Sequence, residues 1–395
     1  MPNSIKFKVC YSLTAFIFLL LGCSKDDMKT SDGPNQSGCQ EPAPYQVNFP
    51  DGKLPWPHHA PGLDEAGYQE LQDQLWIINN FGQYQCGDSQ DGCYFHDGLD
   101  IVLENGTPIY VIEPGILKAI AGNGPYYWSV VVEDMDGLGG AWIYTHITPN
   151  PALKVGDNLP KGACLGAVSF QGLEHLHLSR AYLLEGGAWN RFSDWSTVSP
   201  DDYFIYTDHS PPVIEAPFYF FRNNFPDRFT RSDTTTVNGE VDIVVGIRDP
   251  GQYAHSQSTL YGDRLCVKRI EYEIYREGEL LERRIAFDFN RMQLNRENLA
   301  DKVATVFKFH LEMNPSFMVE DWNRFVSHYI ITNSNGSGIF EPGEVGGKQY
   351  SWKTNALDEA GESLYPNGLY TIRVYAWDNR DNEAVAESLV LVDND

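Results

Sequence analysis

Short stretches in which apolar and polar residues alternate recur along the chain, separated by Gly, Pro and Asn turns. A period of two is the spacing of a half-buried β-strand. Between residues 100 and 182 the clearest stretches are 109–112, 129–133 and 142–144. No long segment with a helical period of 3.6 residues lies in this region, so the pattern predicts a mainly β unit of antiparallel strands.

The alternation resumes after Asp208-His209-Ser210-Pro211-Pro212, which we interpret as a domain boundary. The later stretches are 241–247, 270–275, 368–378 and 387–392. Closing strands of this kind are typical of an immunoglobulin- or fibronectin-like β-sandwich. Residues 295–326 break the pattern and predict a helix or a long insertion. The prediction is thus a β domain over residues 45–207, with its core at 90–185 and residues 45–93 packed on its sheet, followed by a β-sandwich domain over 208–395.

The N-terminus follows a different pattern. Lys6 and Lys8 precede an apolar run, residues 11–21, that is too short for an ordinary membrane-spanning helix. The run ends in Leu20-Leu21-Gly22-Cys23, which resembles the lipobox of bacterial lipoproteins. The resemblance implies a signal peptide over residues 1–22 and a lipid on Cys23; a plain signal peptide is the alternative.

The residues that follow Cys23 indicate where the protein would be anchored. Ser24 in this position resembles outer-membrane sorting in Gram-negative bacteria, and Lys25-Asp26-Asp27 resembles a surface-export signal. We therefore expect an outer-membrane lipoprotein that faces the periplasm or the cell surface and contacts the membrane through its lipid. Residues 23–44 are rich in Ser, Gly, Pro and Asp and predict a flexible tether.

The net charge and the cysteine content restrict the expected binding partners and disulfide bonds. The 395 residues carry a formal charge of −25, which repels phosphate backbones and excludes nucleic acid as an expected partner. Cys86 and Cys93 bracket a polar loop, and we expect them to pair in an oxidising compartment. The remaining odd count leaves at least one thiol over, most simply a buried Cys164 or Cys266. The adjacent His58 and His59 are interpreted as surface residues.

Three short motifs carry the candidate chemistry. His96, Gly98 and Asp100 share one face if their segment is a strand, and Gly98 leaves room between the imidazole and the carboxylate. His175 and His177 likewise share a face, while Leu176 and Leu178 turn to the other face and enter a core. His146 lies in the motif Tyr144-Thr145-His146-Ile147, which begins at the end of the predicted strand 142–144. An imidazole–carboxylate pair opposite an imidazole pair is a ligand set suited to zinc.

These motifs resemble, in order, those of the LytM/lysostaphin-type zinc metallopeptidases, which cut peptide cross-links in bacterial cell walls. The family patterns H-x-x-x-D, Tyr-x-His and H-x-H match His96 to Asp100, Tyr144 to His146 and His175 to His177. The resemblance covers roughly residues 90 to 185. It implies an open sheet with a groove, zinc bound by His96, Asp100 and His177, and catalytic roles for His146 and His175.

The expected function is therefore zinc-dependent endopeptidase cleavage of peptidoglycan cross-links, the D-alanyl–diaminopimelate bond first. The alternative is a non-catalytic wall-binding or amidase-regulating lipoprotein. No H-E-x-x-H or G-x-S-x-G motif supports another hydrolase class. Glu174 and Leu178-Ser179 depart from the family pattern. The Trp/Tyr-rich stretch 180–206 either forms one wall of a substrate groove or packs as an extension of the core.

Overall fold

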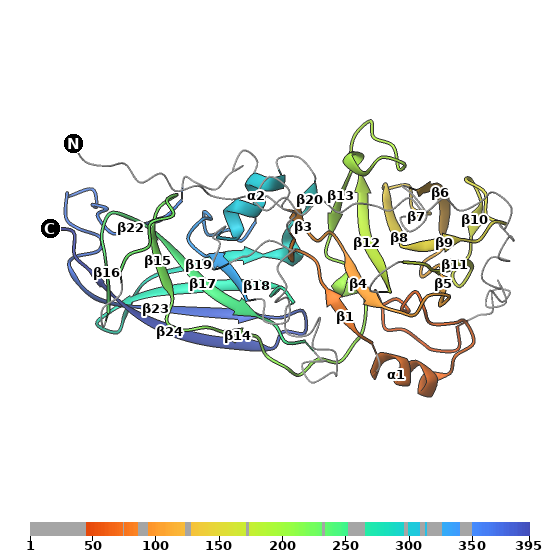
Figure 1. Ribbon diagram of the computed structural model, residues 1–395, viewed down its shortest axis with the longest axis horizontal. Helices are drawn as coiled ribbons and strands as arrows, with labels where there is room; N and C mark the ends of the chain where they lie inside the picture. The colour runs from red at the N-terminus through yellow and green to blue at the C-terminus, as the bar shows by residue number, and fades with distance from the viewer. Residues whose placement is uncertain are drawn as a thin grey trace, which may run out of the picture. The chain divides into compact units, whose positions relative to one another are not determined.

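Asp100, His175 and His177 lie on one nine-stranded antiparallel sheet (Figure 1), whereas His96 precedes the strand of Asp100 and His146 directly follows another strand of the sheet. Its order is β1 (Ile77–Asn79), β4 (Leu99–Val102), β12 (His175–Leu183), β8 (Gly140–Thr145), β7 (Trp128–Asp134), β6 (Gly115–Gly122) and β10 (Asn158–Leu159). β13 (Trp195–Val198) joins β12, and β20 (Leu294–Asn295) joins β13. A second, three-stranded sheet consists of β5 (Pro108–Tyr110), β11 (Cys164–Val168) and β9 (Ile147–Pro149). It adjoins the large sheet, because β9 contacts β7. The mainly β, antiparallel prediction is confirmed.

This computed structural model describes residues 45–73, 75–85, 94–122, 128–170, 174–230, 234–251, 265–295, 299–308, 313, 326–339 and 350–395. The chain divides into two compact units, residues 1–37 and 38–395, and every described residue belongs to the second. The signal peptide, Cys23, the tether and the Cys86–Cys93 pair lie outside the described residues and stay predictions. Within the described residues, no helix is long and apolar enough to cross a membrane.

The alternation of side chains decides which face of the large sheet carries chemistry. Leu99, Ile101, Leu176 and Leu178 are all fully buried in one apolar cluster. Because neighbouring residues on a strand point to opposite faces, this burial turns Asp100, His175 and His177 to the other face. The predicted placement of Leu176 and Leu178 in a core is confirmed.

The segment before the sheet packs on it as predicted. Trp56, in the loop before α1 (Glu65–Asp73), is 0% exposed, shares an apolar cluster with Leu99 of the sheet and donates its indole N–H to the Ile205 carbonyl. β1 pairs with β4, so this extension forms the edge next to the first motif.

The Trp/Tyr-rich stretch forms part of the core. It contains the short 3-10 turns Phe192–Asp194 and Asp201–Tyr203. Trp189 and Trp195 are 6% and 3% exposed and pack with Ala141 and Ile143. The interpretation of this stretch as a packed extension is confirmed for these two rings.

The C-terminal half, residues 208–395, contains two five-stranded sheets. One consists of β14 (Val213–Ile214), β17 (Glu240–Arg248), β15 (Tyr219–Arg222), β21 (Ser327–Ile330) and β22 (Trp352–Lys353). The other runs β16 (Thr235–Val237), β24 (Glu383–Val392), β23 (Gly368–Trp377), β18 (Arg269–Arg276) and β19 (Glu279–Asp288). Both contribute to one apolar core, and α2 (Leu299–Val306) supplies the predicted helix. The immunoglobulin or fibronectin likeness stays a prediction.

The structure identifies which cysteine is left over. Cys266 is a buried free thiol, whereas Cys164 is disulfide-bonded to a partner outside the described residues. The expectation that Cys164 could be the spare thiol is therefore wrong, and the expectation for Cys266 is confirmed.

The interpretation of His58 and His59 as surface residues is wrong for His59, which is 0% exposed. The two rings lie 4.6 Å apart, and the His59 ring contacts Tyr68 edge-on at 4.5 Å. Both ring nitrogens of His59 are buried without a hydrogen-bond partner among the described residues. Burial, with a contribution from His58, lowers the pKa of His59 to about 2.

This buried pair predicts loss of stability in acid. The folded-state pKa of His59 lies below its ordinary value of 6.5, so its contribution is complete above pH 6.5 and is lost as the pH falls toward 2. At pH 4.5 we expect a cost of about 3 kcal/mol relative to neutral pH. His59→Phe should remove that part of the pH dependence in urea unfolding, while His209→Phe, at an exposed position, should not. Equal pH dependence in wild type and His59→Phe would contradict the prediction.

Candidate metal centre

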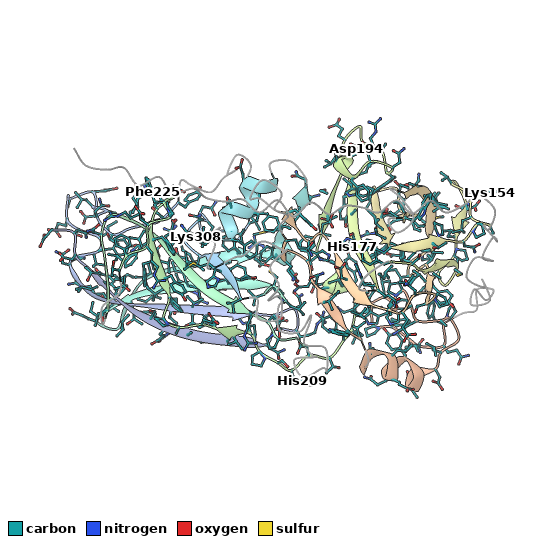
Figure 2. The ribbon with its side chains drawn as sticks, viewed as in Figure 1. Lys154, His177, Asp194, His209, Phe225 and Lys308 are labelled. Atoms are coloured by element: carbon teal, nitrogen blue, oxygen red, sulfur yellow. The ribbon has the colours of Figure 1, made fainter. Side chains whose placement is uncertain are left out.

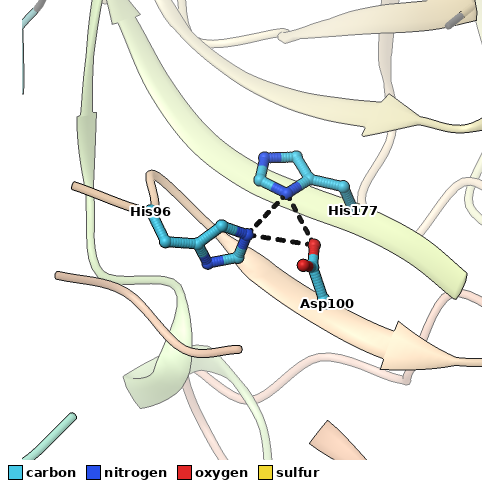
Figure 3. Close-up of side chains that lie close together, drawn as sticks. All are labelled: His96, Asp100 and His177. Atoms are coloured by element: carbon cyan, nitrogen blue, oxygen red, sulfur yellow. Dashed lines mark hydrogen bonds and ion pairs between the residues drawn. The ribbon is translucent and has the colours of Figure 1, made fainter. Parts of the chain in front are cut away.

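Three side chains from two of the predicted motifs converge on one point (Figure 3). His96 Nε2 lies 3.0 Å from Asp100 Oδ1, and His177 Nδ1 lies 2.8 Å from the same oxygen. The two ring nitrogens are 3.0 Å apart. The structure therefore brings together the three residues expected to bind zinc; Figure 2 labels His177 within the whole molecule.

The sheet register produces this convergence. His177 on β12 is the direct cross-strand partner of Asp100 on β4, so the two side chains leave the same face side by side. His96 differs from the expectation, because β4 begins at Leu99 and His96 precedes it. Its position is fixed instead by Gln83, whose carbonyl accepts the His96 backbone N–H at 2.8 Å.

Hydrogen bonds on the outer side of each ring determine which nitrogen faces inward. The His96 Nδ1–H points to the Asn80 carbonyl at 3.1 Å. His177 Nε2 lies 2.9 Å from Ser179 Oγ and 3.2 Å from Asp97 Oδ1. The inward nitrogens therefore carry lone pairs in the neutral rings.

Two nitrogen lone pairs and a carboxylate oxygen this close repel one another unless a proton or a metal ion lies between them. Two imidazoles and one carboxylate are also ligands that zinc uses in proteins, with further coordination left open in catalytic sites. The residues present therefore fit a zinc ion.

The electrostatics of the centre favour positive charge. Burial would raise the pKa of Asp100, but His96, His175 and His177 outweigh it and hold that pKa well below its usual range. Burial would lower the pKa of His177, yet Asp100 and Asp97 raise it to about 10. Asp100 is thus a carboxylate at neutral pH, the form that binds a metal.

The two candidate catalytic histidines lie beside the three ligands. The His146 and His175 rings are 4.6 Å apart, and His175 Nε2 lies 3.6 Å from Asp100 Oδ1. His146 has a φ of 65°, an uncommon conformation for a residue with a Cβ. Backbone hydrogen bonds to Trp128 and from Ser169 hold it there. Strain of this kind at a cluster of polar residues is typical of functional sites.

Glu174, one of the departures from the family pattern, has a structural role. Its two carboxylate oxygens accept from the Asn105 backbone N–H and side-chain amide at 3.0 and 2.7 Å. Asn105 also bonds the backbone N–H and C=O of Phe170. The Phe170 ring then lies 4.3 Å from His146 and 4.7 Å from His175. Glu174 therefore helps to hold an aromatic ring against both histidines.

A second cluster of carboxyl groups has raised pKa values, whereas that of Asp100 is lowered. Asp208, Asp249 and Asp378 are buried within 4.8 Å of one another. Burial is the largest cause of the raised pKa of each of these three carboxyl groups. Neighbouring carboxylates raise the pKa of Asp249 further. The pKa values of these three carboxyl groups are thus shifted in the direction opposite to that of Asp100.

Sequence reasoning missed the residues that orient the ligands. Asn79 donates its amide to Asp100 Oδ2 at 2.5 Å, and Gln83 donates to Asn79 Oδ1 at 3.0 Å. Asn80 supplies the carbonyl for His96, and Asp97 faces the outer nitrogen of His177. Of these residues, only Asp97 could have been identified from the sequence, because it lies inside the H-x-x-x-D motif.

The position of Asp97 predicts a measurable effect on metal affinity. A carboxylate on the outer nitrogen of a ligating histidine fixes its tautomer and makes it more basic. Asp97→Asn is therefore expected to weaken zinc binding about 10-fold in a chelator competition titration. Asp136→Asn removes the same charge at an exposed position and should leave the affinity unchanged. Equal affinities in the two variants would remove Asp97 from this role.

Comparisons with known proteins give partial likenesses to solved structures, among them peptidase domains. No protein-family model matches the chain, and no curated protein matches it. Among solved structures, the chain is similar to the catalytic domain of the antimicrobial peptidase lysostaphin from Staphylococcus simulans, with 24% identity over 29% of this chain and 84% of that one and a TM-score of 0.24.

Two further solved structures are comparable. The catalytic domain of the prophage-encoded protein EnpA from Enterococcus faecalis is 22% identical over 36% of this chain and 95% of that one, with a TM-score of 0.25. LytU is 25% identical over 32% and 81%, also with a TM-score of 0.25. These likenesses each cover about a third of this chain.

Proposed function

We propose that the protein is a zinc-dependent endopeptidase that hydrolyses peptide cross-links of peptidoglycan at the cell envelope, the D-alanyl–diaminopimelate bond first. The observation that carries the proposal is the convergence of His96 Nε2, Asp100 Oδ1 and His177 Nδ1, with His146 and His175 beside them. The order of these motifs along the chain, which resembles the LytM/lysostaphin type, supports the choice of substrate.

A zinc ion bound by His96, Asp100 and His177 would act as a Lewis acid on the scissile carbonyl and lower the pKa of a water molecule. Peptide hydrolysis adds the oxygen of water to the carbonyl carbon, breaks the C–N bond and delivers a proton to the departing amine. One of His146 and His175 would take the proton from water, and the other would donate a hydrogen bond to the developing oxyanion. The Phe170 ring packs against both imidazole rings, tilted to that of His146 and edge-on to that of His175.

The proposal is tested with the soluble chain that begins at Ser24 and purified cross-linked muropeptide dimers. Mass spectrometry should show loss of dimers, with masses that identify the bond, and a chelator should stop the reaction. Readdition of zinc should restore it. Intact dimers in the zinc-loaded protein, with zinc bound one to one, would overturn the endopeptidase and favour the wall-binding alternative.

A further inference from the structure

The segment that supports the first metal ligands is built into the core of the C-terminal half. Phe81 and Phe95 are 3% and 2% exposed and belong to the same apolar cluster as Phe289 and Phe307. The Phe95 ring centroid lies 6.1 Å from each of those two rings. Gly82 lies against the same surface, since a Cβ there would be 2.4 Å from the Phe289 ring.

A buried amide adds a directional link between the two halves. Asn80, which is 2% exposed, donates its side-chain N–H to the Cys266 carbonyl at 2.7 Å and accepts the Cys266 backbone N–H at 2.9 Å. Both ends of the amide are therefore used by one residue of the C-terminal half. Buried amides paired in this way fix orientation as well as position.

The same short segment reaches two of the three ligands. The Asn80 carbonyl accepts from His96 Nδ1, and Asn79 donates to Asp100 Oδ2. The backbone of Gly82 donates to the His96 carbonyl at 2.8 Å. A displacement of this segment would therefore turn the His96 ring and release the Asp100 carboxylate together.

We propose that the C-terminal half positions the ligands of the metal centre. Through Cys266 and the rings of Phe289 and Phe307, it holds in place the segment that orients His96 and Asp100. The inference rests on the metal centre of the proposed function and gives the C-terminal half a role within it. Asn80 is then a positioning residue. It would set metal affinity without touching the metal or the substrate.

A purely structural contact between the halves predicts a different outcome, and Arg380 provides the comparison. Arg380 donates to the carbonyls of Asp201 and Phe204 at 3.1 and 3.3 Å, so it also links the C-terminal half to the first half. Neither carbonyl belongs to the segment that supports His96. Loss of the Arg380 contacts should therefore lower stability and leave the metal centre intact.

The experiment compares Asn80→Ala, Phe81→Leu and Arg380→Met in the chain that begins at Ser24. Zinc affinity is measured by chelator competition, and deuterium uptake of residues 94–102 is measured in the zinc-free protein. Asn80→Ala is expected to weaken zinc binding about 10- to 100-fold and to speed exchange across 94–102. Phe81→Leu keeps an apolar side chain in the core and should shift both quantities in the same direction by less. Arg380→Met should lower the unfolding temperature alone.

The two readouts separate this inference from the proposed function. Wild-type zinc affinity and unchanged exchange in a folded Asn80→Ala or Phe81→Leu variant would overturn it. The same shift of affinity and exchange in Arg380→Met would also overturn it, because the effect would then follow general stability. If wild type itself binds no zinc, the proposed function fails, and the exchange of 94–102 still decides whether Asn80 holds the ligand segment.

Discussion

His177→Ala is expected to abolish stoichiometric zinc binding and to reduce cleavage of cross-linked muropeptides by about 10³-fold or more. His177 Nδ1 is one of three inward ligand atoms, and its outer nitrogen connects the centre to Ser179 and Asp97. Alanine removes both functions and leaves Asp100 without its cross-strand partner. Elemental mass spectrometry measures the zinc content of the purified protein. Mass spectrometry of the muropeptides measures the loss of cross-linked dimers.

A second variant distinguishes metal binding from catalysis. His146 lies beside the ligand group with its ring 6.3 Å from that of His177, so His146→Ala should retain zinc while activity falls about 10²- to 10⁴-fold. His209→Ala, at an exposed position, should match wild type in both measurements. Full zinc content in His177→Ala would contradict the ligand assignment, and full activity in His146→Ala would exclude that residue from proton transfer.

The sequence predicts the placement of the candidate ligands Asp100 and His177 because it depends on a local rule. Alternation along a strand separates His175 and His177 from Leu176 and Leu178 within four residues, and the structure buries both leucines completely. Hydrophobic periodicity likewise predicts the long strands, since a half-buried strand needs one apolar face. These features require no knowledge of what lies far away in the chain.

The positions of the residues that orient the ligands depend on contacts with distant parts of the chain, so a local sequence pattern does not predict them. Asn80 meets Cys266 across 186 positions, and nothing in the local sequence distinguishes it from a loop asparagine. His59 is buried with its ring against Tyr68, although adjacent histidines between prolines are typical of a surface loop. His96 precedes its strand and is held by backbone hydrogen bonds to Gly82 and Gln83, which the spacing of the motif does not reveal.

Gly98→Ala is expected to weaken zinc binding by at least about 10-fold and to cost about 2 kcal/mol of stability. A Cβ at this position would lie 2.4 Å from the Leu178 carbonyl oxygen, 2.8 Å from Ser179 Oγ and 3.0 Å from His177 Nε2. The first contact is with backbone, so β12 must move away from the residue before β4. Because His177 lies on β12 and Asp100 on β4, that movement separates two ligands whose atoms are now 2.8 Å apart.

The matched control for this effect is Gly67→Ala in α1. Its Cβ would meet the side chains of Leu63 at 3.1 Å and Asp64 at 3.4 Å, with no backbone atom in the way. Alanine favours a helix over glycine by up to about 1 kcal/mol, so this variant should be as stable as wild type or more so, with unchanged zinc affinity. Urea unfolding of the zinc-free proteins and chelator competition measure the two quantities. If Gly98→Ala binds zinc as wild type does, β12 and β4 tolerate the added methyl group, and the space beside Gly98 is not what keeps His177 and Asp100 in register.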